Sequence, residues 1–307
     1  MIGRITNQMS AQMTLSGIET ALDRLDTTQQ ELSTGKQINQ PSDNPSGTAL
    51  TLQLNTELSN LGSYSSQVTD GTGWSQASTA AMSDITNAVQ RIQELTVEAA
   101  NGTQTTADMQ ASAQEVNQLI DEIKQDANTQ YNGQYVFSGS ATSTQPYQSG
   151  SNDAYAGNTA TVSRTIGPNT TLTVNANLQS VLGTGQTVSG QPGGDGLLLN
   201  TLRNISDAMQ SGDSSAVNAD MSQLTTNFNS LTGLSANVGA VQDRLQMASS
   251  RIETMQNSDT QVLSNTQDAD MASTEISYST QQAALTAALQ AGASIVQQSL
   301  MNFLGNG

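Results

Sequence analysis

The stretch ISYSTQQAALTAALQAGASIVQQSLMNFLGNG, residues 276–307, contains no charged side chain. Its larger apolar residues nevertheless recur at helical intervals, which predicts a helix with an apolar stripe. A helix that carries Gln, Ser, Thr and Ala in place of Lys and Glu is poorly solvated alone, so we expect burial between packed copies of the chain. The stripe comprises Leu285, Leu289, Val296, Leu300, Phe303 and Leu304.

The other end of the chain carries a matching apolar stripe. Its residues fall largely on four-three spacing, which is the spacing of a coiled-coil seam. Most stripes of this kind pack against a neighbouring helix of the same chain. At the two ends, where surface charge is sparse, we expect an intermolecular assembly interface instead. The N-terminal stripe comprises Met9, Ile18, Leu22, Leu25 and Leu32.

The composition argues against one large globular core. Leu, Ile, Val and Phe together number 57 of 307 residues, the formal net charge is -17, and aromatic residues make up 3% of the chain. Such a chain buries little apolar surface to offset its ordering entropy. We therefore expect elongated helices, partly disordered until they bind a partner.

Several functional classes are excluded by what the sequence lacks. The nine Lys and Arg residues are scattered singly, which gives no cationic surface for nucleic acid or an anionic membrane. Without Cys or His, thiol and imidazole catalysis and nearly all zinc or iron chemistry are excluded. Residues 1–10 show no Sec-type signal, and no apolar run reaches the ~18 residues of a membrane span. The chain would then be cytoplasmic, unless export uses an uncleaved N-terminus.

Apolar periodicity predicts a mainly α chain. Gly-Thr-Gly-Trp at 71–74 is expected to interrupt one helix, whereas the spacing from Leu224 onward continues almost without a slip and would extend about 120 Å if helical. Two prolines, Pro41 and Pro45, place a loop between the first two helices. The predicted helices cover residues 5–32, 46–71, 77–100 and 196–209. A further helix carries Met109 to Ile123 and closes near residue 132, and the long pattern runs from 224 to 303.

The period changes in the middle of the chain. Residues 134–139, 160–166 and 170–175 have the composition of short strands. We therefore predict an elongated antiparallel helical bundle, with a coiled coil formed by both termini and a small outer β domain at the far end. The predicted domains are the terminal helices 1–45 and 260–307, the bundle 46–135 and 196–259, and the β-rich insert 136–195.

No pattern in the sequence favours a catalytic or metal site. The carboxylate pairs at 23 and 26, 121 and 122, and 268 and 270 lack nearby aromatic platforms for a sugar, so solvated helix faces explain them better. Asp43 and Asn44 fit turn chemistry better than a calcium loop. The glycine-rich stretch 183–196 lacks the Lys-Ser/Thr of a phosphate loop. We expect no enzyme and no cofactor.

Several motifs carry a family resemblance. LSTGKQINQPSDNPSGTAL at 32–50 contains the signature loop, QRIQELTVEAANGT stands at 90–103, and YNGQYVFSG stands at 131–139. With these motifs the chain resembles the flagellin superfamily, and most closely its hook-associated protein 3 family of hook-filament junction proteins. Asn44 and Val241 depart from the family pattern. The signature-loop residues are Gly35, Lys36, Pro41, Ser42, Asp43 and Pro45.

The resemblance implies a structural subunit of the bacterial flagellum. Such a subunit is secreted through the flagellar type III channel without a cleaved signal, and its terminal helices pair beside an axial channel. It would lie outside the cell at the hook-filament junction. The implied partners are further copies of itself, hook-associated protein 1, flagellin and an export chaperone on the C-terminal helix. The alternative, a filament flagellin with a reduced outer domain, is disfavoured by Pro41, Pro45 and the Tyr135–Phe137 segment.

Overall fold

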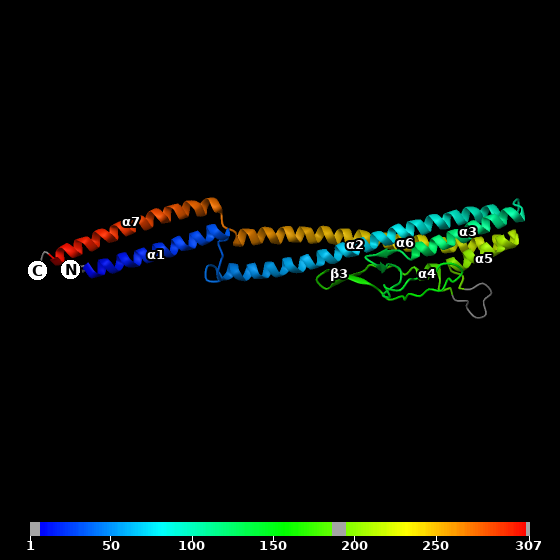
Figure 1. The fold of residues 1–307 in the computed structure, drawn as a ribbon, viewed down its shortest axis with the longest axis horizontal. Helices are drawn as coiled ribbons and strands as arrows, with labels where there is room; N and C mark the ends of the chain where they lie inside the picture. Colours follow the sequence, from blue (N-terminus) through cyan, green and yellow to red (C-terminus); the bar gives the residue numbers. More distant parts are fainter. Residues whose placement is uncertain (1–6, 186–194, 305–307) are drawn as a thin grey trace. The chain divides into compact units, whose positions relative to one another are not determined.

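The computed structural model describes residues 7–185 and 195–304 (Figure 1). The described part contains seven helices and two small antiparallel sheets, as the sequence predicted for a helical chain with a β insert. The helices are α1 (Asn7–Thr34), α2 (Pro45–Ala100), α3 (Thr106–Ala127), α4 (Gln179–Leu182), α5 (Leu198–Ser211), α6 (Ser214–Gln267) and α7 (Met271–Leu304). The strands are β1 (Gln130–Tyr131), β2 (Gln134–Tyr135), β3 (Ser163–Gly167) and β4 (Thr170–Thr173).

The chain divides into two compact units. Unit 1 comprises residues 1–60 and 256–307, and unit 2 comprises residues 61–255. Helices α2 and α6 each contribute to both units.

In unit 1, helices α1 and α7 pair side by side (Figure 1). The pair is antiparallel, because Gly35 meets Ala269 near one end and Ile18 lies beside Gly292 farther along. Gly292 lets the two helices approach closely: a Cβ placed there would lie 3.4 Å from Ile18 Cδ1.

Unit 2 is a helical bundle around one hydrophobic core. Thr79 of α2 bonds Gln242 of α6, and Asn117 of α3 bonds Ser206 of α5. The core side chains recur at helical intervals along α2, α3, α5 and α6. The insert contributes to this same core through Phe137, among others. One continuous cluster therefore holds the bundle and the insert together.

Helix α2 runs without a break, so the predicted interruption at residues 71–74 is wrong. Gly73 leaves room for the ring of Tyr131, which a Cβ would overlap. A Cβ at Gly71 would lie 3.1 Å from Leu245 Cδ2. Trp74, which follows Gly73, is fully buried, with its ring edge-on to Tyr131. The two glycines are thus points of close packing within a helix, which helix propensity alone does not reveal.

The predicted continuous helix 224–303 is also wrong, because α6 ends at Gln267 and α7 begins at Met271. Asp270 caps the new helix: its Oδ1 accepts hydrogen bonds from the N–H groups of Ala272 and Ser273. Asp is a favoured N-cap residue, so it starts a helix where the apolar spacing suggests continuity.

The insert lies against the side of the bundle, not at its far end as predicted (Figure 1). Arg164 of β3 pairs with Asp70 of α2, and the Thr165 N–H bonds Gln67 Oε1. The end of unit 2 is formed instead by the turns on either side of Thr106 and Gly212, which meet there.

The predicted β runs are confirmed at β3 and β4, whereas the predicted strand 134–139 is reduced to two residues. β1 and β2 form a hairpin around Asn132 and Gly133, with φ values of 50° and 76°. Asn-Gly suits such a two-residue turn, and it ends the pairing early. Helix α3 correspondingly ends at Ala127, before the predicted residue 132.

Candidate assembly site

The predicted interface residues occupy two environments in unit 1. Ile18, Leu25 and Leu32 of α1 are half-buried, as is Leu285 of α7. Within one molecule the apolar stripes of α1 and α7 therefore form one seam, because the two helices pack on each other. Two further residues remain mainly exposed: Leu22 at 43% and Leu289 at 52%.

Other apolar side chains of the same helices are more exposed still. Met13 of α1 is 63% exposed and Ile276 of α7 is 70% exposed. Met9, which we expected on the stripe of Ile18, is 46% exposed. Nine residues are two and a half turns of a helix, so Met9 faces away from Ile18. The α1–α7 pair thus has apolar side chains outside its own seam.

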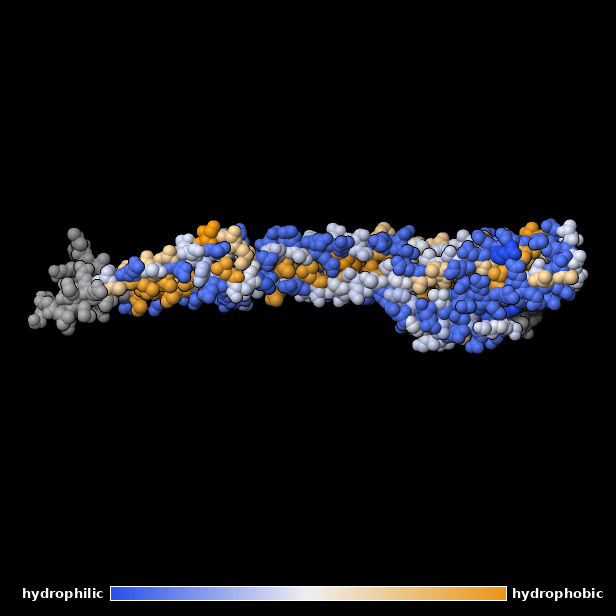
Figure 2. All heavy atoms as spheres, turned by 45° about the horizontal axis from the view of Figure 1, so that its top comes forward, coloured by the Kyte–Doolittle hydropathy of each residue, from blue (hydrophilic) through white to orange (hydrophobic). Residues whose placement is uncertain are grey.

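The exposed apolar residues are concentrated in unit 1. Of the thirteen large apolar side chains that are exposed in the described part, ten belong to this smaller unit. In Figure 2 apolar residues, in orange, run along the left-hand part of the view, which α1 and α7 occupy. The ten are Met9, Met13, Leu15, Leu22, Leu50, Leu52, Val262, Met271, Ile276 and Leu289.

Unit 1 also has almost no core of its own. The hydrophobic cluster of the structure lies entirely between Leu61 and Ile252, within unit 2. In the described part of unit 1, Ile38 and Leu54 are the only buried apolar residues. A two-helix pair with so little buried surface is marginal in water, so its stability calls for further contacts.

The C-terminal part of the predicted stripe lies outside what the structure describes at side-chain level. Helix α7 includes Val296, Leu300, Phe303 and Leu304. The burial of these four side chains is not described, and their assignment to the interface rests on the sequence.

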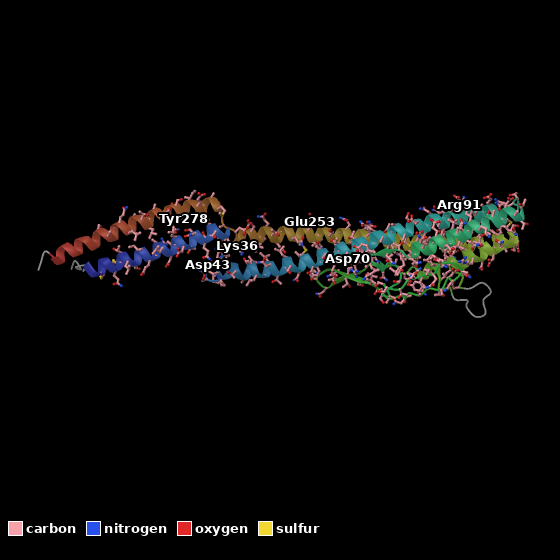
Figure 3. All side chains as sticks on the ribbon, viewed as in Figure 1. Lys36, Asp43, Asp70, Arg91, Glu253 and Tyr278 are labelled. Atoms are coloured by element: carbon pink, nitrogen blue, oxygen red, sulfur yellow. The ribbon has the colours of Figure 1, made fainter. Side chains whose placement is uncertain are left out.

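The signature loop between α1 and α2 is held by its own polar groups (Figure 3). Asp43 Oδ2 accepts the backbone N–H groups of Gln40 at 2.9 Å and Asn39 at 3.0 Å. These two hydrogen bonds keep the pKa of Asp43 below its ordinary value. Pro41, Ser42 and Asp43 are exposed, and Pro45 is the exposed first residue of α2. Proline at this position needs no N–H partner.

The first half of the loop is tied to the break between α6 and α7. Gly35, in the left-handed conformation with φ of 70°, accepts a hydrogen bond from the Ala269 N–H. Gln37 bonds the carbonyl oxygen of Gln267, and the exposed Lys36 is paired with Asp268 in an antiparallel bridge. The break between α1 and α2 and the break between α6 and α7 are therefore bonded to each other at one place, which we call the joint.

Two of the carboxylates considered as acid/base pairs have structural roles. Asp270 caps α7, as described above, and Asp121 accepts the Gly150 N–H. No group of three or more metal-binding side chains occurs in the described residues. None of the helices in this part is long and apolar enough to cross a membrane.

The sequence did not point to the most buried charged side chain of the described residues, which is a lysine. Lys124 of α3 is 1% exposed, and its Nζ donates to Gly150 O, Asn152 O and Asp153 Oδ1. Arg203 of α5 holds the same carboxylate through Asp153 Oδ2 at 3.0 Å. Burial raises the pKa of Asp153, but hydrogen bonds from Arg203 and Lys124 outweigh it and leave the pKa lowered. The only sequence signal was a lysine on the Ile120–Ile123 face of the helix.

Comparison with known proteins shows what this chain is similar to. Residues 5–142 match the sequence model of the bacterial flagellin N-terminal helical region. Flagellin 1 of Proteus mirabilis is 34% identical over 149 residues, which are 48% of this chain and 40% of that flagellin. The chain thus spans less than half the length of this curated relative.

Solved structures with the same fold extend the likeness beyond the flagellin N-terminal region. A protein described as a flagellar hook-associated protein, from Vibrio parahaemolyticus, has a TM-score of 0.64 at 19% identity. The match covers 74% of this chain and all of that one. The flagellar junction protein FlgL from Legionella pneumophila has a TM-score of 0.55 at 14% identity, over 73% of this chain and 100% of that chain. At these identities the likeness is one of fold.

Proposed function

We propose that this chain is a structural subunit of the bacterial flagellum, the adaptor that joins the hook to the flagellin filament. The observation that carries the proposal is the contrast between the two units: unit 2 contains the core, whereas unit 1 leaves ten large apolar side chains exposed. A flagellin N-terminal region and a fold shared with junction proteins support the flagellar setting.

The α1–α7 pair would be the assembly interface. Its seam residues Ile18, Leu25 and Leu285 are half-buried by the partner helix, and a neighbouring copy would complete their burial. Met13, Ile276 and Leu289 would then meet other copies of the chain. The Ala, Ser, Thr and Gln surface of α7, which is uncharged from Ile276 onward, fits a crowded neutral interior better than water.

We propose three roles along the chain. The terminal segments 1–45 and 260–307 assemble, the helical segments 46–135 and 196–259 form a supporting bundle, and the insert 136–195 faces outward. The insert is anchored to the bundle by Lys124 and by the Arg164–Asp70 pair, so it would keep its place during assembly.

The proposed partners follow from this position. The chain would contact hook-associated protein 1 on one side and flagellin on the other, outside the cell. Before export a chaperone would cover the C-terminal stripe around Leu300 and Phe303. Export would need no cleaved signal peptide.

The second candidate is a filament flagellin with a small outer domain, which the identity to Proteus mirabilis flagellin favours. A deletion strain separates the two. Loss of an adaptor leaves hooks intact while the cells shed flagellin monomers into the medium. Loss of a filament flagellin leaves hooks with no flagellin to shed. Cells that remain fully motile after the deletion would contradict both functions.

A further inference from the structure

Asp126, in the last turn of α3, has an unusual environment for a carboxylate. Its Oδ2 is buried and has no hydrogen-bond partner among the described residues. The carboxylate also stands at the C-terminal end of a helix, where the helix dipole disfavours negative charge. Such a group costs folding free energy when it is ionised.

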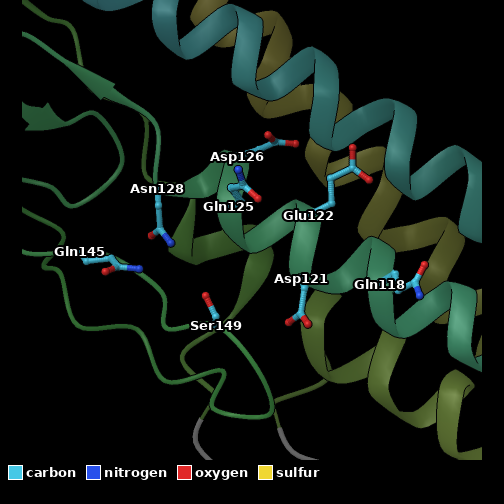
Figure 4. A pocket seen from close by; sticks show the side chains of 8 residues that line it. All are labelled: Gln118, Asp121, Glu122, Gln125, Asp126, Asn128, Gln145 and Ser149. Atoms are coloured by element: carbon cyan, nitrogen blue, oxygen red, sulfur yellow. The ribbon is translucent and has the colours of Figure 1, made fainter.

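Two more carboxylates lie near Asp126. Glu122 precedes it by one helical turn on α3, and both side chains point toward α2 in Figure 4. Asp84 of α2 acts on Asp126 from across the helix pair. Asp121 points the other way in Figure 4 and bonds Gly150 instead. Three acidic groups, Asp84, Glu122 and Asp126, therefore lie close together where α2 meets the end of α3.

No described basic side chain compensates these charges. Lys124 is turned into the insert, where it bonds Asp153. Arg91, the only basic residue of α2, is engaged by Glu94 and Glu115. The segment from 127 to 152 lines a pocket beside Asp126 with Asn128, Gln145 and Ser149 (Figure 4), and it contains no Asp, Glu, Lys or Arg.

We propose that Asp126, together with Asp84 and Glu122, forms a pH-sensitive carboxylate cluster that weakens the packing of α2 against the end of α3 by repulsion when Asp126 is ionised and relieves this repulsion when Asp126 is protonated. The raised pKa of Asp126, about 6, agrees with this role; burial is its largest cause, followed by the charges of Asp84 and Glu122. Unit 2 is therefore more stable in a mildly acidic medium than in a neutral one.

The direction follows from linkage. The folded chain takes up this proton near pH 6, whereas an unfolded aspartate does so only near pH 4. Stability contributed by Asp126 therefore rises as the pH falls from about 7 to about 4. At pH 8 the ionised carboxylate destabilises the fold.

The test is thermal unfolding of the full chain between pH 4.5 and 8, for the wild type, Asp126→Asn and Asp121→Asn. The asparagine at 126 is expected to raise the Tm at pH 8 by about 2–4 °C and to remove most of the change in Tm between pH 7 and 5. Asp121→Asn removes the same charge from a carboxylate that faces away, and should keep the wild-type pH dependence. Equal pH profiles for both variants would overturn the proposal.

Titration of the Asp126 carboxyl carbon by NMR tests the proposed carboxylate cluster without relying on a variant that replaces this residue. The expected midpoint lies near pH 6 in the wild type and shifts downward in Asp84→Asn, because one repelling charge is removed. A wild-type midpoint near pH 4, or a midpoint unchanged by Asp84→Asn, would overturn it.

Discussion

Ala269 donates its backbone N–H to the carbonyl oxygen of Gly35 at 2.9 Å, although 234 positions separate the two residues in the sequence. The bond joins the end of α1 to the break between α6 and α7. It stands beside the Gln37–Gln267 bond, so the turn after α1 and the segment between α6 and α7 are stabilised together. The signature loop is therefore a joint within unit 1.

The joint depends on the backbone of Gly35. Replacing it by alanine should cost about 1 kcal/mol, because L-residues are disfavoured at a φ of 70°. Hydrogen exchange at the Ala269 amide should accelerate correspondingly. The matched control is Gly17→Ala in the middle of α1, where a Cβ meets nothing within 4 Å. That change should stabilise the helix by about 0.5–1 kcal/mol. An unaltered exchange rate in Gly35→Ala would show that the turn does not hold the joint.

The Lys124–Asp153–Arg203 network should hold the insert to the bundle. Lys124→Met leaves Asp153 buried with one of its two cations removed, and should destabilise unit 2 by about 3–5 kcal/mol in urea unfolding. Arg91→Met removes the exposed pairs with Glu94 and Glu115, and should cost less than about 1 kcal/mol. Comparable losses in the two variants would refute a special role for the buried lysine.

The same network predicts a pH effect of the opposite sign to that of Asp126. Because its two cationic partners lower the pKa of Asp153 against the effect of burial, its stabilisation is present above an aspartate's ordinary pKa of about 4. This stabilisation is lost as the pH falls through the folded pKa. The difference between wild type and Lys124→Met should thus shrink below about pH 4, as measured by urea unfolding at successive pH values.

Close packing at Gly73 gives a fourth prediction. A methyl group there would overlap the ring of Tyr131, so Gly73→Ala should lower stability by about 1–3 kcal/mol despite alanine's better helix propensity. Gly62→Ala lies on the same helix with nothing within 4 Å of its Cβ and should raise stability. Calorimetric Tm values that rise in both variants would disprove the packing argument.

The proposed assembly interface gives a fifth prediction. Leu22→Asp combined with Leu289→Asp places charge on exposed positions, so monomers should fold while assembly is lost. The control is Met247→Asp in unit 2, which is 64% exposed and should assemble as the wild type does. Motility and sedimentation of the purified chains measure both effects. Normal assembly of the double variant would count against the interface.

The sequence predicted the helices well where one apolar stripe meets one partner. The seam spacing of Ile85, Ile92 and Ile120 led to α2 and α3. Helix ends were harder, because tertiary contacts decide them. Gly71 and Gly73 suggest a helix break, but Leu245 and Tyr131 occupy the space beside them that a side chain would need. The α6–α7 break is stabilised by a backbone hydrogen bond to distant Gly35.

The candidate site was only partly predictable for a similar reason. Periodicity identified the stripes of Ile18 and Leu285, but it does not say how much of each stripe the partner helix covers. Ile276 and Met13 stand outside the heptad pattern, and their exposure emerges only once α1 and α7 are paired. The burial and pairing of Lys124 could not be predicted, because its partners Gly150 and Asp153 lie in an insert without periodicity.

The most direct test of the account is immunogold electron microscopy of intact flagella from cells that carry an epitope-tagged copy of this chain. The account predicts one narrow band of label between the hook and the filament. Label along the whole filament, or flagella with no label at all, would contradict it.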